Sequence, residues 1–78
     1  MKLQVSYFGM LAEITGTSGE LLDVQDNDVN GLLKTVIAKY PELSRKQFTV
    51  AVDRSIAHKE TSISEDSEIA FLPPFAGG

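Results

Sequence analysis

The chain has 78 residues, 42% hydrophobic and 23% charged, which is typical of one small globular domain. Eleven acidic side chains against seven basic ones give a formal net charge of −4, which argues against nucleic acid as a partner, because phosphate binding draws on clustered Lys and Arg. Cysteine is absent, which excludes disulfides, thiolate metal ligands and thiol nucleophiles. Neither a signal peptide nor a run of ~18 apolar residues is present, so we expect a cytoplasmic protein with no membrane partner.

Alternating side chains open the chain. Residues Lys2–Tyr7 place Leu3, Val5 and Tyr7 on one side, which predicts a half-buried strand. Good helix formers at residues 10–14 predict a short helix that ends at Thr15-Gly16. Residues 21–24 predict a second strand.

An amphipathic helix is predicted over residues 29–40. Asn27-Asp28 offers an N-cap and Pro41 ends the helix. Gly31 costs about 1 kcal/mol relative to Ala inside a helix, and the sequence gives no reason for it. The apolar side chains recur at spacings of three and one: Val29, Leu32, Leu33, Val36, Ile37 and Tyr40.

The remaining elements complete an α+β domain. Residues 48–52 predict a third strand, residues 53–55 a turn, residues 56–58 a short edge strand and residues 68–72 the last strand. One main amphipathic helix across a mixed sheet of four to five strands indicates the ubiquitin-like β-grasp fold. We therefore expect a β-grasp domain over residues 1–72 and a flexible, extended C-terminal tail over residues 73–78.

The side chains offer no catalytic constellation. His58 is the only histidine and lacks a base–orienter partner, so a surface or edge position is expected. The acidic run at residues 65–68 lacks the spaced ligands and glycine of a calcium loop and indicates a solvated turn. Arg45-Lys46 is the only adjacent basic pair, too small for a phosphate-binding patch. We expect no metal, no intrinsically bound cofactor and no enzymatic activity of the chain alone.

The C-terminal segment PPFAGG is different. Six extended residues reach about 20 Å, two prolines stiffen the root, and the end carries almost no side chain. Such a tail could thread into a partner's active site and present the carboxylate of Gly78 without a neighbouring Cβ. A frayed terminus is the alternative that these residues leave open.

The element order and the ending PPFAGG resemble the small subunit of molybdopterin synthase, a ubiquitin-like sulfur carrier. The stretches VSYFGMLAEITG at residues 5–16, VAVD at residues 50–53 and DSEIAFLPPFAGG at residues 66–78 are also similar to that family. The resemblance covers nearly the whole chain. Ala12 is a departure, because some relatives carry Arg in this helix, and it puts one salt bridge to a partner in doubt.

The resemblance implies that Gly78 is the reactive residue. An E1-like adenylyltransferase would activate its carboxylate with ATP, and sulfur from a donor such as a cysteine desulfurase or a rhodanese would replace AMP to give a thiocarboxylate. The large subunit of molybdopterin synthase would bind the carrier in a heterotetramer and pass its sulfur to cyclic pyranopterin monophosphate. The residues that would enter the large subunit are Pro73, Pro74, Phe75, Ala76 and Gly77.

The alternation of side chains along the strands, or strand parity, also predicts a docking patch. If Tyr7 and Phe71 face the core, then Phe8 and Leu72 face outward, with Ile56 on the short strand nearby. Three outward apolar residues near the root of the tail predict a surface for binding partners, and similar positions contact partners in the family. The alternative is that Phe8 closes the edge of the core.

Two other functions share these features. A sulfur carrier for thiamin thiazole, or for another sulfur-transfer pathway, has the same fold and Gly-Gly ending, although Pro73-Pro74 favours the molybdopterin family. A ubiquitin-like modifier would join the same terminus to lysines of other proteins.

Overall fold

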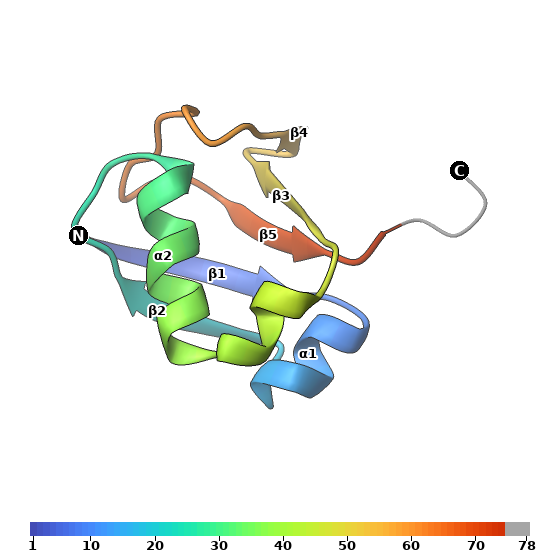
Figure 1. Cartoon of the computed structure of the whole chain (residues 1–78). Helices are drawn as coiled ribbons and strands as arrows, with labels where there is room; N and C mark the ends of the chain where they lie inside the picture. Colours follow the sequence, from blue (N-terminus) through green and yellow to red (C-terminus); the bar gives the residue numbers. More distant parts are fainter. Residues whose placement is uncertain (75–78) are drawn as a thin grey trace.

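The computed structural model describes residues 1–74 and shows a five-stranded mixed sheet with a helix across one face (Figure 1). The strand order is β2-β1-β5-β3-β4, with β1 parallel to β5 and the other neighbours antiparallel. The elements are β1 (Lys2–Tyr7), α1 (Met10–Thr15), β2 (Gly19–Asp23), α2 (Val29–Lys39), the 3-10 helix η1 (Pro41–Arg45), β3 (Thr49–Val52), β4 (Ser55–Ile56) and β5 (Ile69–Leu72). In the part of the chain that the structure describes, no helix is long and apolar enough to cross a membrane.

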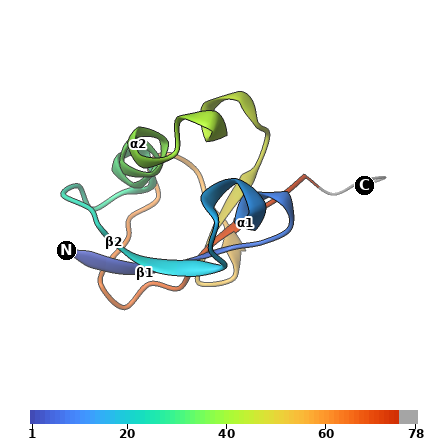
Figure 2. The same cartoon turned by 90° about the horizontal axis from the view of Figure 1, so that it is seen from below.

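The core lies between α2 and the sheet. Figure 2 shows α2 lying across one face of the sheet. Alternation places every second side chain of β1 and β5 on that side, and α2 presents its apolar stripe to them. The predicted orientation of Leu3, Val5 and Tyr7 is confirmed, since all three are buried. The largest fully buried side chains come from both layers: Tyr7, Phe71, Leu3, Leu11, Leu32, Leu43 and Ile69.

The structure explains Gly31. The Asp28 side chain caps α2 by accepting a hydrogen bond of 2.9 Å from the Gly31 amide, as the predicted N-cap requires. Asp26 then lies so close that a Cβ on residue 31 would sit 2.6 Å from its Oδ2. Glycine is therefore suited to position 31 despite its low helix propensity, because a larger residue would collide with the loop that packs against the first turn of α2.

An acidic side chain joins β1, β2 and α2. The hydroxyls of Tyr7 and Tyr40 each donate to Glu20 Oε2 at 2.8 Å, and Lys39 Nζ donates to Glu20 Oε1 at 2.6 Å. Burial acts to raise the pKa of Glu20, but the hydrogen bonds from Lys39, Tyr40 and Tyr7 outweigh it and lower this pKa. Burial, reinforced by Glu20, raises the pKa of Tyr7. The cluster therefore keeps the carboxylate ionised and both phenols protonated near neutral pH.

Some element boundaries differ from those predicted. The sequence indicated only the end of a helix at Pro41, whereas the chain continues into η1, which inserts the buried Leu43 into the core. β2 begins at Gly19 instead of residue 21, because Gly19 pairs with Ser6. β3 and β5 each begin one residue later than expected, and β4 spans Ser55–Ile56 instead of residues 56–58.

The early start of β4 has a local cause. Asp53 and Arg54 both have positive φ, 51° and 69°, which makes a two-residue hairpin turn between β3 and β4. Asp53 accommodates this conformation by accepting a hydrogen bond of 2.9 Å from the Glu68 amide through Oδ1. The predicted turn at residues 53–55 is thus confirmed, but it is tighter than expected.

Candidate functional site

The root of the C-terminal tail is anchored in the middle of the sheet. β5 pairs with β1 on one side and with β3 on the other, and its last residue, Leu72, lies opposite Thr49 (Figure 1). Pro73 and Pro74 follow directly, and neither has an amide hydrogen to extend the ladder. Pairing on both sides therefore holds the chain up to Phe71, and pairing with β3 continues to Leu72, where the strand ends.

The packing of Phe71 fixes the position of β5. Its side chain is fully buried, and its ring lies 5.5 Å from the ring of Tyr7 and 5.6 Å from that of Phe48, centroid to centroid. Aromatic pairs at such distances contribute about 0.5–1.5 kcal/mol each beyond the buried area. The last strand before the tail is therefore among the firmly held parts of the core.

Gly9 is a site residue that the sequence analysis missed. Its φ of 59° and ψ of −135° are accessible mainly to glycine, and a Cβ there would lie 3.0 Å from Pro73 Cγ. Just before it, the amide of Phe8 donates to the carbonyl oxygen of Phe71 at 3.1 Å. The turn between β1 and α1 thus packs against the first proline of the tail. A glycine directly after a strand was the only sequence signal, and it did not indicate which segment it would meet.

The three residues of the predicted docking patch lie on different parts of one surface. Phe8 is 48% exposed and Ile56 is 61% exposed, so the alternative in which Phe8 closes the core is wrong. Leu72 is only half-buried, although the parity argument placed it outward. Leu72 pairs with Thr49, and Ile56 pairs with Ala51. Because side chains alternate along a strand, both pairs lie on the outer face, which is the sheet face away from α2.

The patch is discontinuous. Phe8 follows the parallel pair Tyr7–Phe71 and so lies beside Leu72, whereas Ile56 lies on β4, on the other side of β3. Two further apolar side chains are exposed that the prediction did not include, Leu21 (62%) and Met10 (36%). Leu21 pairs with Gln4 on the outer face. The sequence could have indicated this position, because the next residue, Leu22, faces the core.

The other polar candidates lie apart from the tail root and from one another. His58 is exposed in the loop after β4, as expected, and the acidic run at residues 65–68 is largely exposed, with Glu68 bonded to Arg54 at 3.4 Å. Among residues 1–74 no group of three or more His, Asp or Glu is placed to hold a metal ion. Arg45 ends η1 and is exposed.

The tail itself is described only at its root. Pro73 is half-buried against Gly9, and Pro74 is exposed. The predicted tail residues Phe75, Ala76 and Gly77 and the predicted reactive residue Gly78 lie outside the described residues.

A mixed sheet in this order, with one helix across it and a central last strand that leads into the C-terminal segment, defines a ubiquitin-like β-grasp protein. The family model described as "ThiS family" matches residues 5–78, so the chain belongs to the ThiS family. The match includes the tail as well as the folded domain.

Known proteins are similar over the full length. The molybdopterin synthase sulfur carrier subunit of Mycobacterium tuberculosis is 35% identical over 82 residues, which cover 100% of this chain and 99% of that protein. Among solved structures, SAMP1 from Haloferax volcanii has a TM-score of 0.84 and 25% identity, with 100% of both chains covered.

Two further structures show the same fold at lower identity. Molybdopterin converting factor subunit 1 from Pyrococcus furiosus has a TM-score of 0.88 and 14% identity over 96% of this chain and 99% of that one. A protein–protein complex of subunits 1 and 2 of the molybdopterin-converting factor from Helicobacter pylori contains a chain with a TM-score of 0.67 and 20% identity, with 100% of both chains covered. The predicted β-grasp fold and the resemblance to the molybdopterin sulfur carriers are confirmed.

Proposed function

We propose that this chain is the sulfur carrier of a molybdopterin synthase and that it carries sulfur as a thiocarboxylate on Gly78. The observation that carries the proposal is the family match over residues 5–78, together with 35% identity to a protein named as this carrier. The chain has no cysteine, so a sulfur that it carries covalently would be held by a carboxyl carbon. The firmly anchored β5 supports this role, because a tail that enters another protein needs a rigid origin.

The chemistry requires an activating partner. A carboxylate is a poor acyl donor, so the Gly78 carboxylate would first attack the α-phosphate of ATP in an E1-like adenylyltransferase, forming an acyl adenylate and releasing pyrophosphate. The outer sulfur of a cysteine persulfide on a cysteine desulfurase or a rhodanese would then displace AMP from the carboxyl carbon and form an acyl disulfide. Attack of a second thiol on the cysteine sulfur of that disulfide would release the thiocarboxylate on Gly78 and leave a disulfide between the two thiols. This domain contributes reach and orientation, and the partners contribute the catalytic groups.

The outer face is the surface we propose for docking. Phe8 and Leu72 lie beside the tail root, so a partner that receives the tail would contact them, and Ile56 would contribute at the far side of β3. The complex of subunits 1 and 2 from Helicobacter pylori supports a large subunit of molybdopterin synthase as that partner. The resulting assembly would be the heterotetramer that the resemblance implies.

The test is the intact mass of the chain purified from cells that contain its activating enzyme. We expect a mass gain equal to the replacement of one oxygen by sulfur. We also expect loss of this gain, and of ATP–pyrophosphate exchange, when Gly78 is deleted or when one residue is added after it. Gly77→Val should impair exchange because a β-branched side chain restricts the backbone in a narrow channel. Full exchange by the deleted or extended chain would refute the proposal.

The likeness to SAMP1 over the full chain favours a second candidate, a protein modifier. Both functions use an activated terminus, but a modifier would transfer its carboxyl group to a lysine amine instead of exchanging oxygen for sulfur. An immunoblot for higher-mass conjugates, followed by mass spectrometry of the linkage, separates the two. A third assay, reconstitution with a thiazole synthase in place of the molybdopterin synthase large subunit, tests the thiamin pathway.

A further inference from the structure

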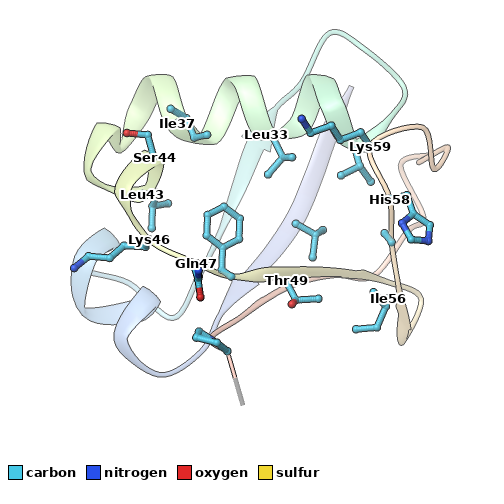
Figure 3. A pocket seen from close by; sticks show the side chains of 15 residues that line it. Leu33, Ile37, Leu43, Ser44, Lys46, Gln47, Thr49, Ile56, His58 and Lys59 are labelled. Carbon is cyan, nitrogen blue, oxygen red and sulfur yellow. The ribbon is translucent and has the colours of Figure 1, made fainter. Parts of the chain in front are cut away.

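A groove with a volume of about 870 Å³ runs between α2 and the segment that leads into β3 (Figure 3). This volume lies within the range of roughly 300–1,000 Å³ that is typical of ligand sites. Its walls are apolar: Leu33 and Ile37 project from α2, and Phe48 and Val50 line the opposite side. We call it the α2–β3 groove; it lies on the helix side of the sheet, and Thr49 and Ile56 of the outer face form part of its rim.

The charge of the groove is opposite to that of the molecule. Lys46 lies at one end and Lys59 at the other (Figure 3), and none of the described lining residues is Asp or Glu. The chain as a whole carries 11 acidic and 7 basic side chains. Within residues 1–74 neither lysine takes part in a salt bridge. The groove therefore combines an apolar floor with two available cations.

The strand edge of β3 that faces the groove is covered by β4 and the residue after it. β4 pairs only with Ala51 and Val52, and one further hydrogen bond of 2.9 Å joins the Ala57 amide to the Val50 carbonyl oxygen. The chain then leaves the sheet toward α2, where the Asn30 amide donates to the Lys59 carbonyl oxygen at 3.0 Å. Alternation along β3 directs the amide and the carbonyl of Thr49 toward β5, where Thr49 pairs with Leu72. We therefore expect an occupant of the groove to be held by side chains and not by a strand ladder.

We propose that the α2–β3 groove is a second docking site, for an extended segment of a partner protein in which aliphatic side chains are flanked by carboxylates. The aliphatic side chains of this segment would pack on Leu33 and Ile37, and its carboxylates would reach Lys46 and Lys59. Charge complementarity selects an acidic segment, because a basic one would meet two uncompensated lysines. The groove shares Thr49 and Ile56 with the outer face, but the binding does not involve Gly78 and so does not depend on the chemistry of the proposed sulfur transfer.

The groove lies next to the root of the tail. Both Pro74 and Ile56 line it, so an occupant of the groove would adjoin the tail root. An acidic segment bound there would hold the carrier while the tail enters a separate active site. The acidic segment could thus belong to a scaffold, or to an extension of one of the carrier's enzymes.

The test uses the full chain and a capped seven-residue peptide with three alternating valines and isoleucines between two glutamates at each end. In a two-dimensional NMR titration we expect the largest shifts at residues 46–50 and at Leu33 and Ile37. Lys46→Glu and Lys59→Glu should each weaken binding roughly fivefold at low salt, whereas Lys34→Glu, an equal charge change on α2 outside the lining, should change it by less than about twofold.

Several outcomes would overturn the proposal. It fails if the peptide shifts residues of the outer face instead, if lysines in place of the glutamates leave the affinity unchanged, or if Lys46→Glu and Lys34→Glu behave alike. It also fails if the groove is already filled by residues 75–78, in which case deletion of these residues from the free chain would shift Leu33 and Ile37. Concentration-dependent shifts at the groove without peptide would identify a second copy of the chain as the occupant and would equally refute the proposal.

Discussion

The contact between Gly9 and Pro73 leads to a prediction about tail direction. In Gly9→Ala, the new Cβ would have a backbone φ of 59° and would lie 3.0 Å from Pro73 Cγ. Carbon atoms pack best at about 3.5–4.0 Å, so the proline must retreat by about 0.5–1 Å. The strained backbone alone costs about 1–3 kcal/mol. A loss of 2 kcal/mol corresponds to a fall in Tm of roughly 8–16 °C for a domain of this size.

Gly16→Ala is the matched control, because residue 16 has a φ of 79° and no atom within 4 Å of its Cβ position. Both variants should lose stability in thermal unfolding. Only Gly9→Ala should also slow ATP–pyrophosphate exchange, since a displacement of about 1 Å at a reacting group can cost about 100-fold in rate. Adding Pro73→Ala, which removes the Cγ atom, should recover part of that exchange. Equal exchange by the two single variants at a temperature where both are folded would refute the reasoning.

Other predictions concern the core and the docking surface. Glu20→Gln should lower the free energy of unfolding by about 1.5–3 kcal/mol near neutral pH, the range for hydrogen bonds to a charged group. Because the folded pKa of Glu20 is lowered, this stability is present above the ordinary pKa of about 4.3 and is lost as the pH falls through the folded pKa, so urea denaturation of wild type and variant should converge in acid. Phe8→Ala should weaken binding to the large subunit by about 1–2 kcal/mol in calorimetry while the Tm stays near that of the wild type; a large fall in Tm with unchanged affinity would contradict this. Gly31→Ala should destabilise the fold by about 1–3 kcal/mol through contact with Asp26, although Ala is the better helix former, and an increase in stability would show that the loop yields instead.

Long periodic patterns were predicted well, because their signal is local. β1 has the predicted bounds, and α2 ends within one residue of the predicted end, since alternation in one case and an N-cap and a proline in the other mark them within the chain itself. The β-grasp fold followed, because one amphipathic helix between two strand pairs has few compact arrangements. The short helix at residues 10–14 was also predicted, because Thr15-Gly16 marks its end, whereas η1 was missed: no local pattern marks it, and it places Leu43 in the core.

The candidate site shows the same division. Contacts between residues that are distant in the sequence could not be predicted. The role of Gly9 depends on Pro73, and that of Gly31 depends on the path of the loop at Asp26. The role of Glu20 depends on both Tyr7 and Tyr40. Parity indicated the outward direction of Phe8 and Leu72, but the expectation that Ile56 lies near them could not show that β3 separates Ile56 from the other two.

The sequence by itself determined the type of each long element, the side of the first and last strands that faces the core, and the motif that would carry the chemistry, because these depend on side-chain periodicity and residue type along the chain. The tertiary structure alone decided the central position of β5, the packing of the tail root on Gly9 and the cationic α2–β3 groove. These features arise from strand order and from the approach of segments that are distant in sequence, and no local pattern of residues encodes them.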